Sequence, residues 1–514
     1  MERYFLGIDI GTFESRGILI DESFRVAADA SVPHGMDNPQ PGWFEQDAEA
    51  VWWGDLCKLC RTLIKQSEIR PEQIACVGTS ALGTDCLPVD EQCRPLRPAI
   101  LYGIDARASE EAAWLTEHYG QARVQELFGH PICSGDTATK ILWLRRHEPE
   151  IYAKTAYFLT GSSFLTARLT GKYVIDQSLA KGSFRPLYQA DGSVNEAECG
   201  LYCRPDQIAA CAWSTDIVGT VTPEAAAQTG LAAGTPVITG TGDSTAEAIS
   251  VGLVEPGTAF FQYGSSMFYY YCTDRFVGSY VSPQGNGTLK GGKAFTVPGT
   301  YCLGDGTNAA GTLTRWVRDL LYSKELDAEK QGGENAYAVM AREAAAVPPG
   351  SDGLIMLPYI YGERSPLQDA EATGMLFGLK GTHGRAQINR AALEAVGYST
   401  YQHLLLFEEL GVPPRRIITA GGGTKNAAWM QIICDMAGMP LTIPEPFQCS
   451  SYGDAMLAAL GIGALESFAA LCAALPQGRI LQPDRKNHEF YQEHYPIFRD
   501  LYLENRDRMH RMQK

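Results

Sequence analysis

The N-terminal segment alternates between apolar runs and short polar turns, the pattern of β-strands joined by tight turns. An apolar run from Tyr4 to Ile10 ends at Gly11-Thr12, and a second run returns over Gly17 to Ile20 and leads to a third strand. A helical pattern follows over about residues 48–66, and residues 74–78 form a short apolar run typical of a buried strand. Strand and helix alternate from there, which predicts a layered α/β fold.

The second half of the chain repeats this layout. The apolar run 258–263 ends at Gly264-Ser265-Ser266, and residues 267–272 return as a second strand. Each half therefore opens with a β-hairpin whose turn is glycine followed by hydroxyl residues. We expect two related halves that meet near residues 251–256.

The length of the chain supports this division. A chain of 514 residues is too long for one hydrophobic core. We expect a first domain over residues 1–253, a second over residues 254–465, and a C-terminal helical extension over residues 466–514.

Composition narrows the function classes. The net charge of -16 makes a nucleic-acid partner unfavourable, because an acidic surface repels phosphates. The N-terminus does not have the pattern of a signal peptide, and the apolar runs are too short to span a bilayer, so we expect a soluble, cytoplasmic protein without a membrane partner. Cys57 and Cys60 form a single CxxC without a second pair nearby, which favours reduced thiols over zinc.

Two glycine turns are candidate phosphate sites. After Asp9, Gly11 permits a tight turn in which backbone N–H groups and the Thr12 hydroxyl can hold phosphate oxygens. A carboxylate at the end of this strand also suits a hydrated magnesium ion. The turn at Gly264 has the matching place in the second half, and two such turns facing each other would hold a triphosphate from both sides. The alternative for each is a plain hairpin turn.

A third segment presents one carboxylate on a glycine-rich turn. The apolar run 236–238 leads into residues 239–244, where Asp243 could accept a hydroxyl proton during phosphoryl transfer. The alternative is that Asp243 caps the helix expected over residues 246–251, and both roles can hold together.

A fourth segment places three glycines between a strand and a helix. Gly421, Gly422 and Gly423 follow the apolar run 416–419 and precede Asn426, so a flat ligand or phosphates could approach the backbone closely. The alternative is a tight turn, which needs fewer glycines. The chain lacks GxGxxG after its first strand and lacks HExxH and GxSxG, the usual signs of dinucleotide enzymes, zinc peptidases and serine hydrolases.

Together these segments resemble the FGGY carbohydrate kinases, members of the actin-like ATPase superfamily, from about Tyr4 to Leu465. Residues 135–147 and 374–395 are similar to the two signatures of that family. The resemblance implies two ribonuclease H-like domains flanking a cleft, with the sugar mainly against the first domain and ATP with Mg²⁺ on the second. Sugar and ATP would be the small-molecule partners, and a homodimer is one expectation because dimers are common in the family.

The resemblance also implies roles for individual residues. Asp243 takes the position of the catalytic base, and Asp9 and Asp243 lie where Mg²⁺ would be held. The positions that match ATP-binding segments of the family are Asp9, Gly11, Thr12, Arg16, Gly264, Ser265, Ser266, Gly306, Gly311, Gly421, Gly422, Gly423 and Asn426.

The acceptor is less clearly indicated. Residues 42–47 resemble xylulokinases, whereas residues 173–180 and 308–319 resemble gluconate kinases. The substrate loop departs from both, because Leu82 replaces a histidine, and this changes the hydrogen bonds open to a sugar. The predicted acceptor-binding residues are Ser80, Ala81, Leu82, Asp105, Arg107 and Asp243.

The main hypothesis is an ATP-dependent kinase of a pentulose such as D-xylulose. The alternatives are a gluconate or polyol kinase of the same fold, a non-catalytic ATP- and sugar-binding sensor, and a chaperone-like or filament-forming ATPase of the same superfamily.

Overall fold

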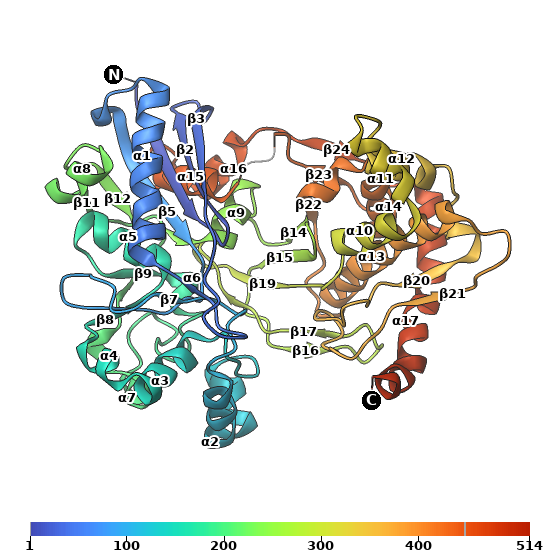
Figure 1. Ribbon diagram of the computed structural model, residues 1–514, viewed down its shortest axis with the longest axis horizontal. Coiled ribbons are helices and arrows are strands. Elements are labelled where there is room, and N and C mark those ends of the chain that lie inside the picture. Colours follow the sequence, from blue (N-terminus) through green and yellow to red (C-terminus); the bar gives the residue numbers. More distant parts are fainter. Residues whose placement is uncertain (1, 447–448, 514) are drawn as a thin grey trace.

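The computed structural model describes residues 2–446 and 449–513 and contains two large mixed sheets, one on each side of the molecule (Figure 1). The first sheet has the order β11-β12-β5-β1-β2-β3, with β13 pairing β5. Its strands are β1 (Tyr4–Ile10), β2 (Glu14–Asp21), β3 (Val26–Pro33), β5 (Ile74–Ala81), β11 (Ile217–Thr220), β12 (Pro236–Ile238) and β13 (Thr241–Gly242).

The second sheet has the order β18-β19-β15-β14-β22-β23-β24. Its strands are β14 (Thr258–Tyr263), β15 (Met267–Thr273), β18 (Lys293–Ala294), β19 (Tyr301–Gly306), β22 (Arg416–Ala420), β23 (Leu441–Ile443) and β24 (Arg479–Leu481). The five remaining strand pairs are β4 (Glu45–Gln46) with β7 (Ala99–Ile100), β6 (Leu87–Val89) with β8 (Tyr157–Leu159), β9 (Val174–Asp176) with β10 (Ala210–Ala212), β16 (Tyr280–Val281) with β17 (Thr288–Leu289), and β20 (Ile355–Leu357) with β21 (Met375–Phe377).

The two sheets share one topology. In the first, β1 pairs antiparallel with β2 and parallel with β5; in the second, β14 pairs antiparallel with β15 and parallel with β22. The outer strands also correspond. β12 pairs parallel with β5 and β23 pairs parallel with β22, and the edge strands β11 and β24 pair antiparallel with β12 and β23. The expectation of two related halves, each opening with a hairpin, is confirmed, as is the mixed α/β fold class.

Helices cover both sheets (Figure 1). The first half contributes α1 (Gly54–Ser67), preceded by a wider turn at Ala48–Trp53, α2 (Ser109–Leu127), α3 (Thr137–His147), α4 (Pro149–Lys154), α5 (Gly161–Thr170), α6 (Gln177–Ala180), α7 (Glu196–Tyr202), α8 (Pro223–Thr229) and α9 (Asp243–Ser250). The second half contributes α10 (Gly311–Leu321), α11 (Ser323–Lys330), α12 (Ala336–Ala345), α13 (Arg385–Glu409), α14 (Ala427–Ala437), α15 (Ser450–Gly461), α16 (Phe468–Ala474) and α17 (Arg485–Met512).

Helix α15 crosses from the second half of the chain to the first sheet. A Cβ at Gly7 on β1 would lie 1.8 Å from the carbonyl oxygen of Ser451, and a Cβ at Gly78 on β5 would lie 2.3 Å from that of Asp454. Only glycine permits such close packing of a helix on a strand. Residues 450–461, which we expected in the second domain, therefore pack on β1, β2 and β5 of the first sheet, and Figure 1 shows α15 beside β2.

A hydrophobic core joins the two halves. It draws Phe5 from the first sheet, Phe260 and Ile418 from the second, and Tyr452 and Met456 from α15 into one buried cluster. The two sheets and α15 therefore share one buried core.

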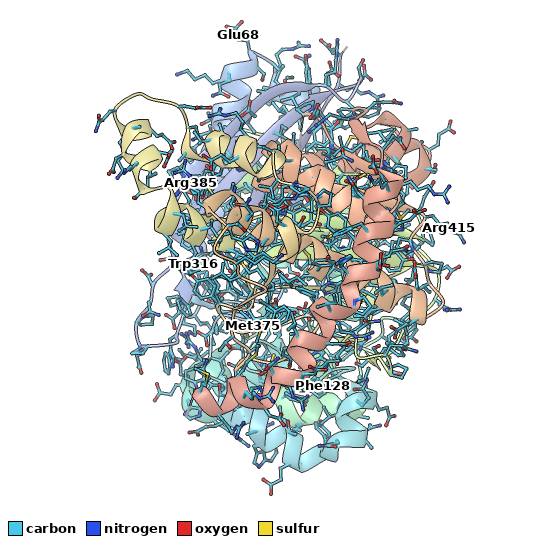
Figure 2. All side chains as sticks on the ribbon, turned by 90° about the vertical axis from the view of Figure 1, so that its right-hand side faces the viewer. Glu68, Phe128, Trp316, Met375, Arg385 and Arg415 are labelled. Atoms are coloured by element: carbon cyan, nitrogen blue, oxygen red, sulfur yellow. The ribbon has the colours of Figure 1, made fainter. Side chains whose placement is uncertain are left out.

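The C-terminal segment closes the second half. Helix α17 runs along the outer side of that half (Figure 2) and stacks Phe498 on Tyr398 of α13. The sequence predicts only helices after residue 465, and the structure adds β24 at the edge of the second sheet. A three-residue strand is too short to show a period of two in the sequence. None of the helices in the described ranges has the length and apolar character needed to cross a membrane.

Candidate active site

Asp9 lies at the bottom of the site, on β1 opposite Ser80 on β5. The Ser80 hydroxyl contacts Asp9 Oδ1 at 2.8 Å and Asp454 Oδ2 at 2.6 Å. A hydroxyl carries one hydrogen, so two such short contacts require a proton on one of the carboxyl groups. Burial raises the pKa of Asp9 to about 8, with the charge of Asp243 adding to the effect, and burial also raises that of Asp454. Ser80, predicted to bind the acceptor, lies fully buried beneath Asp9 with its hydroxyl engaged.

Asp243 lies beside Asp9 because of strand register. Thr241 on β13 pairs with Ser80, which pairs with Asp9, so the three strands end together. Asp243 follows as the first residue of α9, whose N-cap is Gly242, so the alternative that Asp243 is the N-cap is wrong. Burial raises its pKa, although hydrogen bonds from Ser244 oppose the shift. A carboxylate whose pKa is raised holds a proton more readily than an ordinary one, which suits a proton acceptor at this edge of the sheet.

A third carboxylate completes a cluster. Glu247 lies one helical turn after Asp243 on α9, and burial together with the charge of Asp243 raises its pKa to about 7. In the described chain, Oδ2 of Asp9 and Oδ2 of Asp243 receive no hydrogen bond. Buried negative charge with open oxygen atoms favours a bound cation. No three His, Cys, Asp or Glu side chains in the described ranges form a ready-made metal site, so phosphate and water oxygens would complete the coordination.

The first hairpin turn lies above Asp9. The backbone N–H of Gly11 donates to the carbonyl of Glu14 at 3.1 Å, which closes the turn. The Thr12 hydroxyl lies 3.2 Å from that of Tyr102, a residue the sequence did not assign. Arg16 is exposed and paired with Glu14, so its guanidinium is accessible from solvent.

The second hairpin turn rests on the N-terminus of α10. The carbonyl of Gly264 accepts from Gly311 N at 2.9 Å, and that of Ser265 accepts from Thr312 N at 2.9 Å. A Cβ at Gly311 would lie 2.5 Å from Gly264 O, and one at Gly306 2.3 Å from Met267 O. The predicted glycines of this region are therefore brought together by close backbone packing. Ser266 closes the turn, since its carbonyl accepts from Gly264 N at 3.0 Å.

A cavity of about 500 Å³ opens beside the second turn. Six predicted ATP-binding residues line it, namely Gly264, Ser265, Gly311, Gly422, Gly423 and Asn426. Two aromatic residues, Tyr263 and Trp429, are also among its lining residues, which suits a planar base. The structure thus brings together residues from three separate segments of the sequence.

The three consecutive glycines have different surroundings. Gly421 has φ +93°, and its Cβ would lie 2.6 Å from Tyr263 O, so the fold requires glycine there. A Cβ at Gly423 would lie 2.8 Å from Tyr263 Cβ, whereas one at Gly422 meets no described atom within 4 Å. Asn426 caps α14 by accepting from Trp429 N at 3.1 Å. Only Gly422 of the three faces open space.

The other predicted acceptor residues lie in two places: Ala81 and Leu82 at and after the end of β5, and Asp105 and Arg107 in a buried ion pair. Ala81 ends β5, and Leu82 is buried in the core of the first half. Arg107 is fully buried in an ion pair with Asp105 and lies over the ring of Trp43 at 4.3 Å. Asp105 also accepts from Phe44 N at 2.7 Å, so this pair anchors the loop that carries Tyr102.

Sequence reasoning missed several residues of the site. Asp454 and Glu247 sit on helices whose patterns do not show that they reach Asp9 or Asp243. Lys140 lies within the signature-like segment 135–147, which was the available signal, and Asp85 directly follows the substrate loop. Both are fully buried charged residues.

Comparison with known proteins assigns the family. The N-terminal domain model of the FGGY family of carbohydrate kinases matches residues 4–250, and the C-terminal domain model matches residues 263–462. A xylulose kinase of Escherichia coli K12 is 30% identical over 501 residues, covering 97% of this chain and 98% of that protein. A gluconokinase of Bacillus subtilis 168 is 28% identical over 505 residues, covering 98% and 96%.

Solved structures agree with this assignment. The crystal structure of xylulose kinase from Rhodospirillum rubrum superposes with a TM-score of 0.88 at 28% identity, covering 99% of this chain and 100% of that one. Gluconate kinase from Lactobacillus acidophilus, at 21% identity and TM-score 0.85 over 98% of both chains, shares the fold. The chain belongs to the FGGY family of carbohydrate kinases, enzymes that phosphorylate a sugar with ATP and a divalent metal ion.

Proposed function

We propose that this enzyme transfers the γ-phosphate of ATP to a hydroxyl group of a pentulose, with D-xylulose as the leading candidate. The position of Asp243 carries the proposal, because strand register sets it beside Asp9 at the foot of the first hairpin turn. The similarity to proteins named xylulose kinase, which extends over nearly the whole chain, supports the choice of acceptor.

The chemistry follows from the placement of these groups. Asp243 removes the proton from the attacking hydroxyl while the new bond forms between that oxygen and the γ-phosphorus. The bond from the γ-phosphorus to the bridging oxygen breaks, and ADP leaves with the electron pair. Phosphoryl transfer depends mainly on alignment and charge neutralisation. The turns at Gly11 and Gly264 hold phosphate oxygens, and the cavity beside Gly422 holds the adenosine.

We assign Mg²⁺ to the carboxylates of Asp9 and Asp243. The raised pKa of Asp9 and the open oxygens of both residues fit a hard cation that keeps several water and phosphate ligands. When bound, the ion neutralises phosphate charge. Asp454 and Ser80 hold Asp9 in place from below.

We retain sugar acids as a second class of acceptor. Gluconate remains a candidate because a gluconokinase covers the chain almost as fully as the xylulose kinases do. The sensor hypothesis is disfavoured because Asp9, Asp243 and the glycine turns are all in place. We also propose that the enzyme works in the cytoplasm on small molecules, without nucleic-acid or membrane partners, and that it forms a homodimer.

Release of ADP from Mg-ATP, measured against pentuloses, hexuloses, alditols and sugar acids, tests the proposal. A strong rate with a pentulose supports it, and a strong rate only with gluconate replaces the acceptor. If ATP binds but no acceptor stimulates ADP release, the proposal is rejected in favour of the sensor hypothesis.

A further inference from the structure

Asp85 is a fully buried carboxylate without a well-formed hydrogen bond. Neither of its two oxygens receives a hydrogen bond of normal geometry in the part of the chain that the structure describes, although the Lys140 ammonium and the backbone N–H of Tyr102 lie near enough to oppose the rise of its pKa. Leaving a carboxylate unpaired in a protein interior is strongly unfavourable, so such groups nearly always have a partner. The partner of Asp85 is therefore expected to come from outside the fold.

The position of Asp85 places it at the edge of the sheet that carries the proposed base. It follows β5 by four residues, and Asp243 follows β13, the neighbour of β5. The two loops touch, because a Cβ at Gly242 would lie 3.7 Å from Cα of Gly83. Asp85 and Asp243 therefore begin from adjacent strand ends.

Asp85, Tyr102 and Asp243 lie close enough for the charge of one to affect the pKa of another. Burial raises the pKa of Asp85, and the charge of Asp243 adds to the shift. Burial also raises the pKa of Tyr102, and the charges of Asp243 and Asp85 both contribute. The Tyr102 hydroxyl in turn contacts that of Thr12 in the first hairpin turn. Asp85, Tyr102 and Asp243 thus lie near one another, next to the first hairpin turn.

Lys140 supports Asp85 from behind. Its ammonium is fully buried and donates to the carbonyls of Thr84 at 2.5 Å and Gly135 at 3.0 Å. These bonds fix the loop next to Asp85, and the positive charge favours the ionised carboxylate. Lys140 uses two of its three ammonium hydrogens on backbone carbonyls and donates no hydrogen bond to Asp85, so the Asp85 oxygens can still accept hydrogen bonds from a ligand.

We propose that Asp85 is a specificity-determining residue that accepts hydrogen bonds from two hydroxyl groups of the acceptor and selects a neutral ketose or polyol over a sugar acid. The inference rests on the proposed function and deepens it. Hydroxyl groups donate to a carboxylate, whereas the carboxylate of a sugar acid would meet the charges of Asp85 and Asp243 and be repelled. A structural alternative is that Asp85 serves only as counter-charge for Lys140.

The variant Asp85→Asn tests the proposal, with kcat and KM measured for D-xylulose, xylitol, gluconate and ATP. We expect KM for the preferred neutral acceptor to rise about 10- to 100-fold, as on losing a hydrogen bond to a charged group, while KM for ATP stays the same. The ratio of kcat/KM for the neutral acceptor to kcat/KM for gluconate should fall by a similar factor. Asp55→Asn is the matched control, because Asp55 is equally buried but bonded to Ser15 and Lys58.

A second measurement needs only the wild-type enzyme and the preferred acceptor. Analogues lacking one hydroxyl should raise KM about 10-fold or more at two positions, and in Asp85→Asn these penalties should shrink. Unchanged acceptor KM in Asp85→Asn, or no penalty for any deoxy analogue, overturns the inference and favours the counter-charge role. A wild-type preference for gluconate overturns the inference alone, whereas inactivity on every acceptor overturns the proposed function with it.

Discussion

The side chain of Gln262 donates a 2.5 Å hydrogen bond to the carboxylate of Glu247. Gln262 belongs to β14 of the second sheet, two residues before the turn at Gly264, and Glu247 belongs to α9, which begins at the proposed base Asp243. This bond connects the strand that leads into the second hairpin turn with the helix that carries the proposed base. A change in the position of β14 can therefore affect α9 through this one hydrogen bond.

Replacing Gln262 tests this connection. In Gln262→Leu the Glu247 carboxylate loses its hydrogen-bond donor, so the pKa of Glu247 should rise further. A proton held on Glu247 should then interfere with proton uptake by Asp243. We expect kcat to fall about 10-fold at pH 7, with an acidic limb of the pH profile displaced to higher pH. The control Gln125→Leu removes the amide of an exposed residue on α2 that donates to Gly129 O, and should behave as wild type. An unshifted pH profile in Gln262→Leu would contradict the prediction.

Asp243→Asn separates binding from chemistry. The amide cannot accept the hydroxyl proton, so kcat should fall by about 10² to 10⁴, the usual contribution of a general base. The affinity for ATP, measured by calorimetry without acceptor, should change little because the cavity residues are untouched. Near-normal turnover in this variant would remove Asp243 from the role of base.

Gly422→Val probes the adenosine cavity without disturbing the fold. A Cβ at Gly422 meets no described atom within 4 Å, so the valine side chain should project into the space that ATP would fill. We expect the Kd for ATP to rise by about 10-fold or more and Tm without ligand to stay the same, because the loss is steric and confined to the ligand. Gly381→Val is the control, since Gly381 is equally open but lies outside the cavity. An unchanged Kd for ATP would show that the nucleotide lies elsewhere.

Local patterns in the sequence predicted the strands and turns of the site well. The hairpins after Asp9 and before Gly264 repeat one pattern of apolar runs and glycines, and the structure confirms the two related sheets. Asp243 was recognisable because a glycine-rich turn after a strand presents a single carboxylate. These features depend on residues close together in sequence, where the pattern has direct meaning.

Contacts between distant segments could not be predicted in this way. Ser80 was expected to bind the acceptor, yet it holds Asp9 and Asp454, and Asp454 lies 374 residues away in sequence. Asp105 and Arg107 were expected at the same site, but they pair with each other, and Arg107 also pairs with Glu45. The contact of Ser80 with Asp454 depends on helix α15 crossing to the first sheet, and nothing local in residues 450–461 indicates that crossing.

The buried carboxylates also predict how stability depends on pH. The pKa of Asp9 is raised from the ordinary 3.8 to about 8 in the folded state. Between these values the folded protein binds more protons than the unfolded chain, so this group lowers the free energy of unfolding as pH rises from about 4 to about 8. Asp9→Asn removes the penalty. We expect the variant without metal to match wild type near pH 4 and to exceed it by about 0.5–2 kcal/mol at pH 8.

Scanning calorimetry of wild type and Asp9→Asn from pH 4 to 8, with and without Mg²⁺, measures this difference. Mg²⁺ should raise Tm of the wild type at pH 8, because a cation favours the ionised carboxylates, and should raise that of the variant less. Asp55→Asn, which removes a buried carboxylate outside the cluster, should keep the wild-type response to Mg²⁺. Parallel profiles of stability against pH for wild type and Asp9→Asn would mean that burial does not raise the pKa of Asp9. Equal stabilisation of both proteins by Mg²⁺ would mean that Asp9 does not contact the ion.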